Sequence, residues 1–85
     1  MGTFFFDYQE KAMQLEKVLY SFGCFYFNGN IVQKDTAKAF EYFQKAANIG
    51  NAAAWRRIGM IHEANKDYPN AMSAFTTAAY KGDAD

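Results

Sequence analysis

The sequence has little cysteine, proline, histidine or tryptophan, and none of its apolar runs is long. Cys24 is the single cysteine, so no disulfide can form within the chain, and a reducing cytoplasm is the default compartment. A secreted or periplasmic mature form stays open. No segment reaches the roughly 20 apolar residues needed to span a bilayer, and the N-terminus lacks the basic start and long apolar core of a signal peptide. These absences predict a soluble protein with no membrane contact.

The chain also has no excess of either positive or negative charge. Nine basic residues balance nine acidic ones, so the formal net charge is zero. Nucleic-acid-binding proteins usually carry a basic excess that neutralises phosphates. The balance argues against nucleic acid as a partner, including RNA bound by helical repeats, and gives no reason to expect an anionic membrane surface.

Aromatic residues, by contrast, are abundant. Nine Phe, six Tyr and one Trp make up 19% of the 85 residues. Large rings bury much apolar area per residue, which helps so short a chain to form a core. The apolar fraction of 51% excludes a disordered chain, and the length leaves room for one domain, residues 1–85.

The chain contains an internal repeat. The segment Asp35–Gly50 aligns with Asp67–Gly82 at an offset of 32, and Asp, Ala, Phe, Ala-Ala and Gly coincide. Further upstream, Phe22-Gly23 aligns with Ile58-Gly59 at an offset of 36. The difference of four residues falls in the connector Asn28–Lys34, and insertions are tolerated in loops.

The alignment divides the chain into two units. The first unit is residues 15–50, and the second is residues 51–85, which ends with the start of a further unit. Residues 1–14 fit neither unit and are expected to be an N-terminal helical extension or a cap. The chain is either a whole protein or a fragment of a longer repeat array.

The spacing of the apolar residues and the positions of helix-capping and helix-ending residues predict about four helices and no strand. Asp35 is a suitable N-cap and Gly50 a suitable terminator of the second helix. Trp55 to His62 belong to the third helix, and Asp67 with Pro69 begins the fourth. The first helix, from about Asp7 to Phe27, carries an apolar stripe at spacings of three and four: Leu15, Val18, Leu19, Phe22, Phe25 and Tyr26. The predicted fold class is all-α, a short α-α superhelix of two helix–turn–helix repeats.

Gly23 and Gly59 fall in the middle of predicted helices. A glycine there costs up to about 1 kcal/mol relative to alanine. The cost is tolerable where a large ring packs against bare backbone, and Phe43 and Phe75 are the equivalent rings of the two units. We therefore expect the ring of one phenylalanine to pack against each glycine.

These positions resemble two related repeat families. The second unit resembles the tetratricopeptide repeat in its W–LG–Y–A–F–A spacing, carried by Trp55, Ile58-Gly59, His62, Ala71, Phe75 and Ala78. His62 replaces the usual Tyr, and the closing Pro is absent. The first unit is similar to the Sel-like repeat through Phe22-Gly23, the connector Asn28–Asp35 and the segment Lys45–Gly50. The resemblance implies scaffolds and adaptors, in which the first helix of each unit lines a concave groove that binds peptides.

Carried onto this sequence, the resemblance gives a candidate partner-binding groove: Lys17, Tyr20, Cys24, Phe27, Asn28, Arg56, Arg57, Met60 and Glu63. Such a groove suits a peptide with an apolar anchor and an acidic residue. The alternative is that the charged members form only a solvated helix face. The carboxylate clamp of some relatives is not expected, because Tyr20 and Cys24 stand where it needs Lys and Asn.

Catalysis, metal binding and cofactors are not expected. His62 is interpreted as a packing residue in a position that Tyr usually fills. Cys24 and His62 on neighbouring helices would be two members of a nucleophilic site, but no third orienting group is evident. Two soft ligands also fall short of the three or four that zinc requires.

Two functions follow. The first is a protein-interaction module that binds another protein or peptide as an adaptor, scaffold piece or small inhibitor. The alternative is a structural protein that self-associates, as a homodimer through the Phe4, Phe5 and Phe6 cluster or through the uncovered repeat end, since about three repeats are usually needed for stability. The three phenylalanines are otherwise interpreted as a cap that folds back over the first helix.

Overall fold

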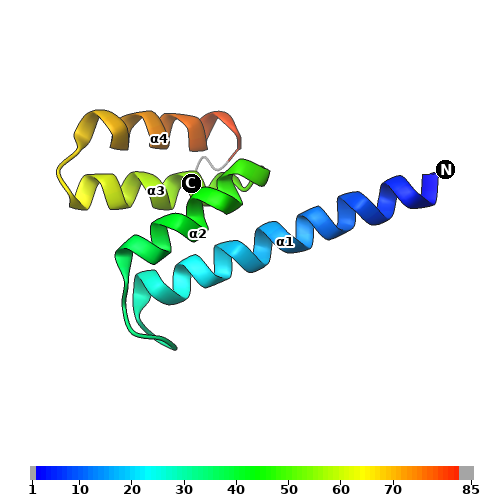
Figure 1. The fold of residues 1–85 in the computed structure, drawn as a ribbon. Helices are drawn as coiled ribbons and strands as arrows, with labels where there is room; N and C mark the ends of the chain where they lie inside the picture. Colours follow the sequence, from blue (N-terminus) through cyan, green and yellow to red (C-terminus); the bar gives the residue numbers. More distant parts are fainter. Residues whose placement is uncertain (1, 83–85) are drawn as a thin grey trace.

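The computed structural model describes residues 2–82, with side chains from residue 10 onward, and shows a stack of helices (Figure 1). Each helix packs against its neighbours in chain order, and the packing within each helix pair is more extensive than that between the pairs. No strand occurs within residues 2–82, so the predicted all-α fold of two helix–turn–helix repeats is confirmed. The helices are α1 Gly2–Asn28, α2 Thr36–Ile49, α3 Ala52–Ala64 and α4 Tyr68–Tyr80.

Helix α1 is much longer than the others, with 27 residues against 14 in α2. Figure 1 shows its N-terminal half projecting away from the other three helices. The helix begins at Gly2 rather than near Asp7, because no glycine or proline interrupts residues 3–22. Phe4, Phe5 and Phe6 therefore belong to α1 itself, and the interpretation of these residues as a cap folded back over it is wrong. Their side chains lie outside the described part of the structure.

The ends of α2 follow the predicted local chemistry. The Asp35 side chain accepts a hydrogen bond from the Lys38 backbone N–H at 3.1 Å, which satisfies one of the free donors of the first turn. Gly50 has φ 117°, in the left-handed region, and its N–H donates to the Ala47 carbonyl at 3.0 Å. Both predicted boundaries are confirmed, and the chain turns at Gly50 directly into α3.

The cap of α3 gives a first testable prediction. Asn51 is buried, and its side-chain oxygen accepts a hydrogen bond from the Ala54 N–H at 2.8 Å. Asn51→Ala is expected to lower the free energy of unfolding by about 1–2 kcal/mol, since a buried donor loses its partner. Urea unfolding followed by the fluorescence of Trp55, the single tryptophan, measures the change.

Asp67 provides the matched control, because it precedes α4 but makes no hydrogen bond from its side chain to the helix backbone. Asp67→Ala should therefore cost clearly less than Asn51→Ala. Equal losses would show that the buried cap does not stabilise α3.

The core is built around α2 from alanines and three larger side chains, Phe43, Ile58 and Ile61. Phe43 and Ile58 are the largest fully buried side chains. A Cβ placed on Gly23 would lie 2.6 Å from two ring carbons of Phe43, and one on Gly59 would lie 2.7 Å from Phe75 Cε1. The phenylalanine ring of each unit thus packs against the mid-helix glycine of the same unit, as predicted.

The face of α1 that packs differs from the predicted stripe. The packed face centres on the buried Gly23, with Leu19, Tyr20, Cys24, Tyr26 and Phe27 against the core. Leu15, Val18 and Phe22 are instead 51%, 47% and 42% exposed. The close approach of Gly23 to Phe43 decides which side of α1 faces inward, and at 3.6 residues per turn Phe22 then points about 100° away. We call the exposed residues Leu15, Val18 and Phe22, together with the half-buried Phe25 that packs on Phe22, the outer stripe.

Candidate functional site

The candidate groove residues lie on α1 and α3, the first helices of the two units. We call this surface the α1–α3 face. Tyr20, Cys24 and Phe27 are half-buried and pack against the core, while Arg56 and Arg57 are half-buried on α3. The exposed members are Lys17, Asn28, Met60 and Glu63.

Arg57 joins the two units across this face. Its Nε donates a hydrogen bond to the Tyr20 hydroxyl at 3.1 Å. The guanidinium carbon lies 6.0 Å from the ring centroid of Tyr20 and 5.6 Å from that of Phe27, within cation–π range. Both rings in turn contact Phe43, at centroid distances of 5.6 and 6.1 Å. The cation is thus held on an aromatic support that rests on the core.

The surroundings of Arg57 favour its charged form. The hydrogen bond to Tyr20 raises the pKa of the guanidinium and outweighs the opposing effect of burial, and Cys24 adds a smaller electrostatic contribution. Within residues 10–82, no carboxylate lies at ion-pair distance from Arg57. Because Nε is already occupied, the two terminal nitrogens of the guanidinium are the ones placed to bind a carboxylate from outside.

The structure connects only part of the candidate set. Arg57 contacts both Tyr20 and Phe27, and Cys24 contributes to the raised pKa of Arg57. The bond between Tyr20 and Arg57 spans 37 positions in sequence, so no local pattern could have indicated it. That the exposed residues share in binding stays a prediction.

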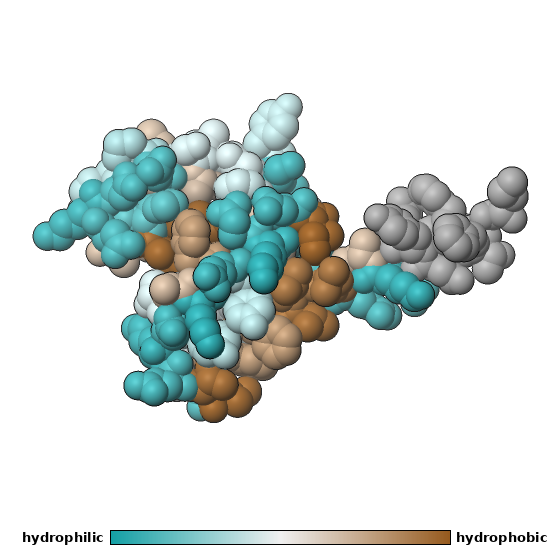
Figure 2. Space-filling view, viewed as in Figure 1, coloured by the Kyte–Doolittle hydropathy of each residue, from teal (hydrophilic) through white to brown (hydrophobic). Residues whose placement is uncertain are grey.

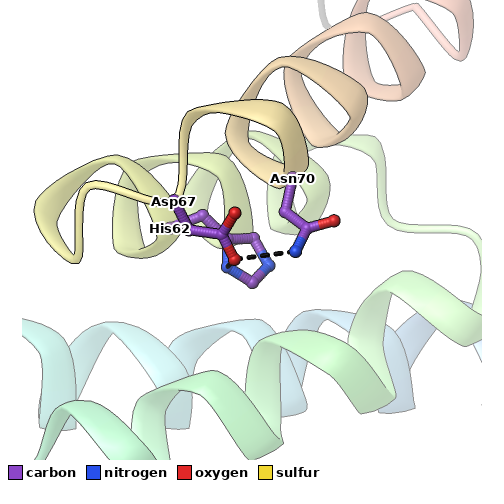
Figure 3. A network of polar contacts seen from close by, with 3 residues as sticks. All are labelled: His62, Asp67 and Asn70. Carbon is purple, nitrogen blue, oxygen red and sulfur yellow. Dashed lines mark hydrogen bonds and ion pairs between the residues drawn. The ribbon is translucent and has the colours of Figure 1, made fainter.

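His62 lies elsewhere, at the junction of α2, α3 and α4. Its ring packs edge-on against Phe40 with centroids 5.5 Å apart. Figure 3 shows its Nδ1 beside Asp67, at 3.9 Å from Oδ2, which also accepts a 2.7 Å hydrogen bond from Asn70 Nδ2. In the described part of the chain no hydrogen bond joins His62 to Cys24. The histidine acts here as an interhelical contact.

Metal-binding clusters and membrane-spanning helices are both absent from the described residues. No group of three or more His, Cys, Asp or Glu side chains there could hold a metal ion. None of the described helices combines the length and the hydropathy that crossing a bilayer requires.

Two open depressions border the later helices. One of about 550 Å³ lies between α2 and α3 and includes Phe40 and His62. Another, of about 320 Å³, opens on α4 and includes Tyr68, Met72 and Phe75. Glu63 is the one candidate groove residue that lines either of these two depressions.

The glycine–aromatic contact in each unit and the antiparallel helix pairs define an α-helical repeat protein. The family model of the Sel1 repeat matches residues 19–51, so the predicted resemblance of the first unit to this repeat is confirmed. Repeats of this kind generally mediate protein–protein interactions.

A curated relative is similar over most of the chain. It is the general transcriptional corepressor CYC8 of Saccharomyces cerevisiae, 36% identical over 64 residues. The match covers 73% of this chain but only 7% of the corepressor.

Proposed function

We propose that the protein binds a segment of another protein on the α1–α3 face, with Arg57 as the anchor for an acidic side chain of that segment. The observation that carries the proposal is the state of Arg57: fixed by Tyr20 and Phe27, charged, and without a carboxylate partner in residues 10–82. The Sel1 match supports a protein as the ligand.

Two physical effects favour this use of Arg57. Ordering a long side chain on binding costs about 0.5–1.5 kcal/mol, and the contacts with Tyr20 and Phe27 meet much of that cost before a partner arrives. A carboxylate on a partly buried guanidinium also forms a stronger hydrogen bond than one in open water. Met60, 37% exposed on the same helix as Arg57, offers an adaptable apolar contact for a neighbouring side chain.

The proposal predicts that Arg57→Gln weakens binding at least tenfold, about 1.4 kcal/mol. A displayed library of random peptides supplies the ligands, and we expect the enriched sequences to place Asp or Glu beside an aliphatic or aromatic residue. Anisotropy titration of labelled peptides measures the dissociation constants. Raising the salt concentration should weaken binding to the parent protein more than to Arg57→Gln, because an ion pair is screened.

Two variants sharpen the test. Tyr20→Phe keeps the ring on Phe43 but removes the hydrogen bond to Arg57, so it should weaken binding less than Arg57→Gln. Lys45→Gln removes a cation that also lies over a ring, 5.8 Å from the centroid of Tyr42, but on α2 rather than on the α1–α3 face, so it should have no effect. Enriched peptides without an acidic residue, or equal losses in the Arg57 and Lys45 variants, would refute the assignment.

A further inference from the structure

Equivalent residues of α1 and α3 differ sharply in exposure. At the offset of 36, the outer stripe of α1 aligns with four residues of α3 and its N-cap that are at most 9% exposed. The aligned pairs are Leu15 with Asn51, Val18 with Ala54, Phe22 with Ile58, and Phe25 with Ile61. Ala54, Ile58 and Ile61 are buried in the same cluster as α2 residues Ala39 and Phe43. The residues of α3 that correspond to the outer stripe therefore pack against the preceding unit.

The opposite end of the stack shows the complementary difference. At the offset of 32, Phe40 and Ala47 of α2 align with Met72 and Ala79 of α4. Helix α3 covers this part of α2: Ala47 is 4% exposed, and Phe40 packs on His62. On α4, Met72 is 71% exposed and Ala79 is also exposed. We call the α4 surface around Met72, Phe75 and Ala79 the open α4 face; part of it lines the depression of about 320 Å³.

The two uncovered surfaces lie at opposite ends of one molecule. Figure 1 shows α1 and α4 separated by α2 and α3, so a single copy cannot bring its outer stripe onto its own α4. Figure 2 shows hydrophobic surface over the middle of α1. Exposed apolar residues grouped on one helix face usually mark a contact surface.

We propose that copies of this chain stack head to tail, with the outer stripe of one copy on the open α4 face of the next. Within each copy, α3 packs on α2. The proposed contact between copies has the same arrangement, with α1 of one copy packed on α4 of the next. A second copy of the chain therefore fits both surfaces. The zero net charge leaves no overall repulsion between copies to oppose association. A contact between two different faces does not close on itself, so it produces dimers, trimers and longer stacks. This inference is independent of the role proposed for Arg57.

Sedimentation equilibrium over a concentration series, with variants at each end, tests the stack. The weight-average mass of the parent chain should rise beyond two copies as concentration increases. Val18→Glu on the outer stripe and Met72→Glu on the open α4 face should each reduce it to that of one chain, 9.7 kDa. Both positions are about half exposed or more, so each variant should unfold at the parent's urea midpoint. Ile31→Glu, at a loop residue with the same 71% exposure as Met72, is the matched control and should associate like the parent.

Mixing the two variants distinguishes this contact from a symmetric one. Val18→Glu keeps an intact α4 face and Met72→Glu keeps an intact outer stripe, so an equimolar mixture should form a dimer of twice the single-chain mass and nothing larger. A parent chain that stays at 9.7 kDa up to about 1 mM, roughly 4 kcal/mol of association free energy, overturns the proposal. So does a single variant that still dimerises, or a mixture that stays monomeric. Arg57→Gln should associate normally, which separates this result from that of the groove.

Discussion

Phe43→Ala is expected to lower the free energy of unfolding by about 3–5 kcal/mol, the range for a large aromatic side chain removed from a closed core. Phe43 is 0% exposed, and its ring contacts Tyr20 and Phe27 and fills the space above Gly23. The cavity opens where both units meet, so the surrounding helices cannot collapse into it without losing these contacts. Since a domain of this length has a total stability of only about 4–13 kcal/mol, the variant should be close to unfolded at 37 °C.

Phe75→Ala is the matched control for this loss. Phe75 occupies the same place in the second unit and packs on Gly59 in the same way, but it is only half-buried. We expect a cost of about half that of Phe43→Ala, because less apolar surface is removed from water. Urea unfolding of both variants, followed by Trp55 fluorescence and by circular dichroism, gives the comparison. Similar losses of unfolding free energy in the two variants would mean that the junction between the units does not stabilise the first unit.

The features that the sequence predicted well are the ones that local chemistry or the repeat determines. Asp35 and Gly50 act within a turn of their own positions, so the limits of α2 could be read from them. The contacts of Gly23 with Phe43 and of Gly59 with Phe75 were predictable because the alignment places a costly glycine and a large ring at matching positions in both units.

The outward side of α1 could not be predicted in the same way. Leu15, Val18 and Phe22 have the spacing of a buried stripe, and their equivalents in the second unit are indeed buried. Whether such a stripe is covered depends on a preceding unit, which residues 2–82 do not contain. The apolar spacing therefore identifies the face of α1 that corresponds to a buried face in the second unit, but it does not show that this face of α1 is exposed.

The candidate site was predicted only in outline. The family spacing placed Tyr20, Phe27 and Arg57 on the same surface, and in the structure Arg57 contacts both rings. The pattern treated them as equivalent lining residues, whereas Tyr20 and Phe27 are half-buried supports that fix Arg57. This division of roles depends on the angle at which α1 crosses the second unit, which no spacing within one helix encodes.

Gly23→Ala is expected to destabilise the protein by about 2 kcal/mol, although alanine is the better helix former by about 1 kcal/mol. The new Cβ would lie 2.6 Å from Cδ1 and Cε1 of Phe43, well inside van der Waals contact. The ring is fully buried between Tyr20 and Phe27, so relief requires α1 and α2 to move apart, and overpacking of this kind typically costs about 1–3 kcal/mol. Gly59→Ala should be nearly neutral, because half-buried Phe75 can shift toward solvent.

A double-mutant cycle isolates the contact between Gly23 and Phe43. Phe43→Leu removes the ring carbons that the methyl group introduced by Gly23→Ala would strike, so the double variant should be more stable than the sum of the two single losses implies. We expect a coupling energy of about 1 kcal/mol, within the usual range for side chains in direct contact. The same cycle on Gly59 and Phe75 should give a coupling near zero. Additive losses at Gly23 and Phe43 would mean that the helices relax around the added methyl group, and that the fold does not depend on the close approach of α1 to α2 at this glycine.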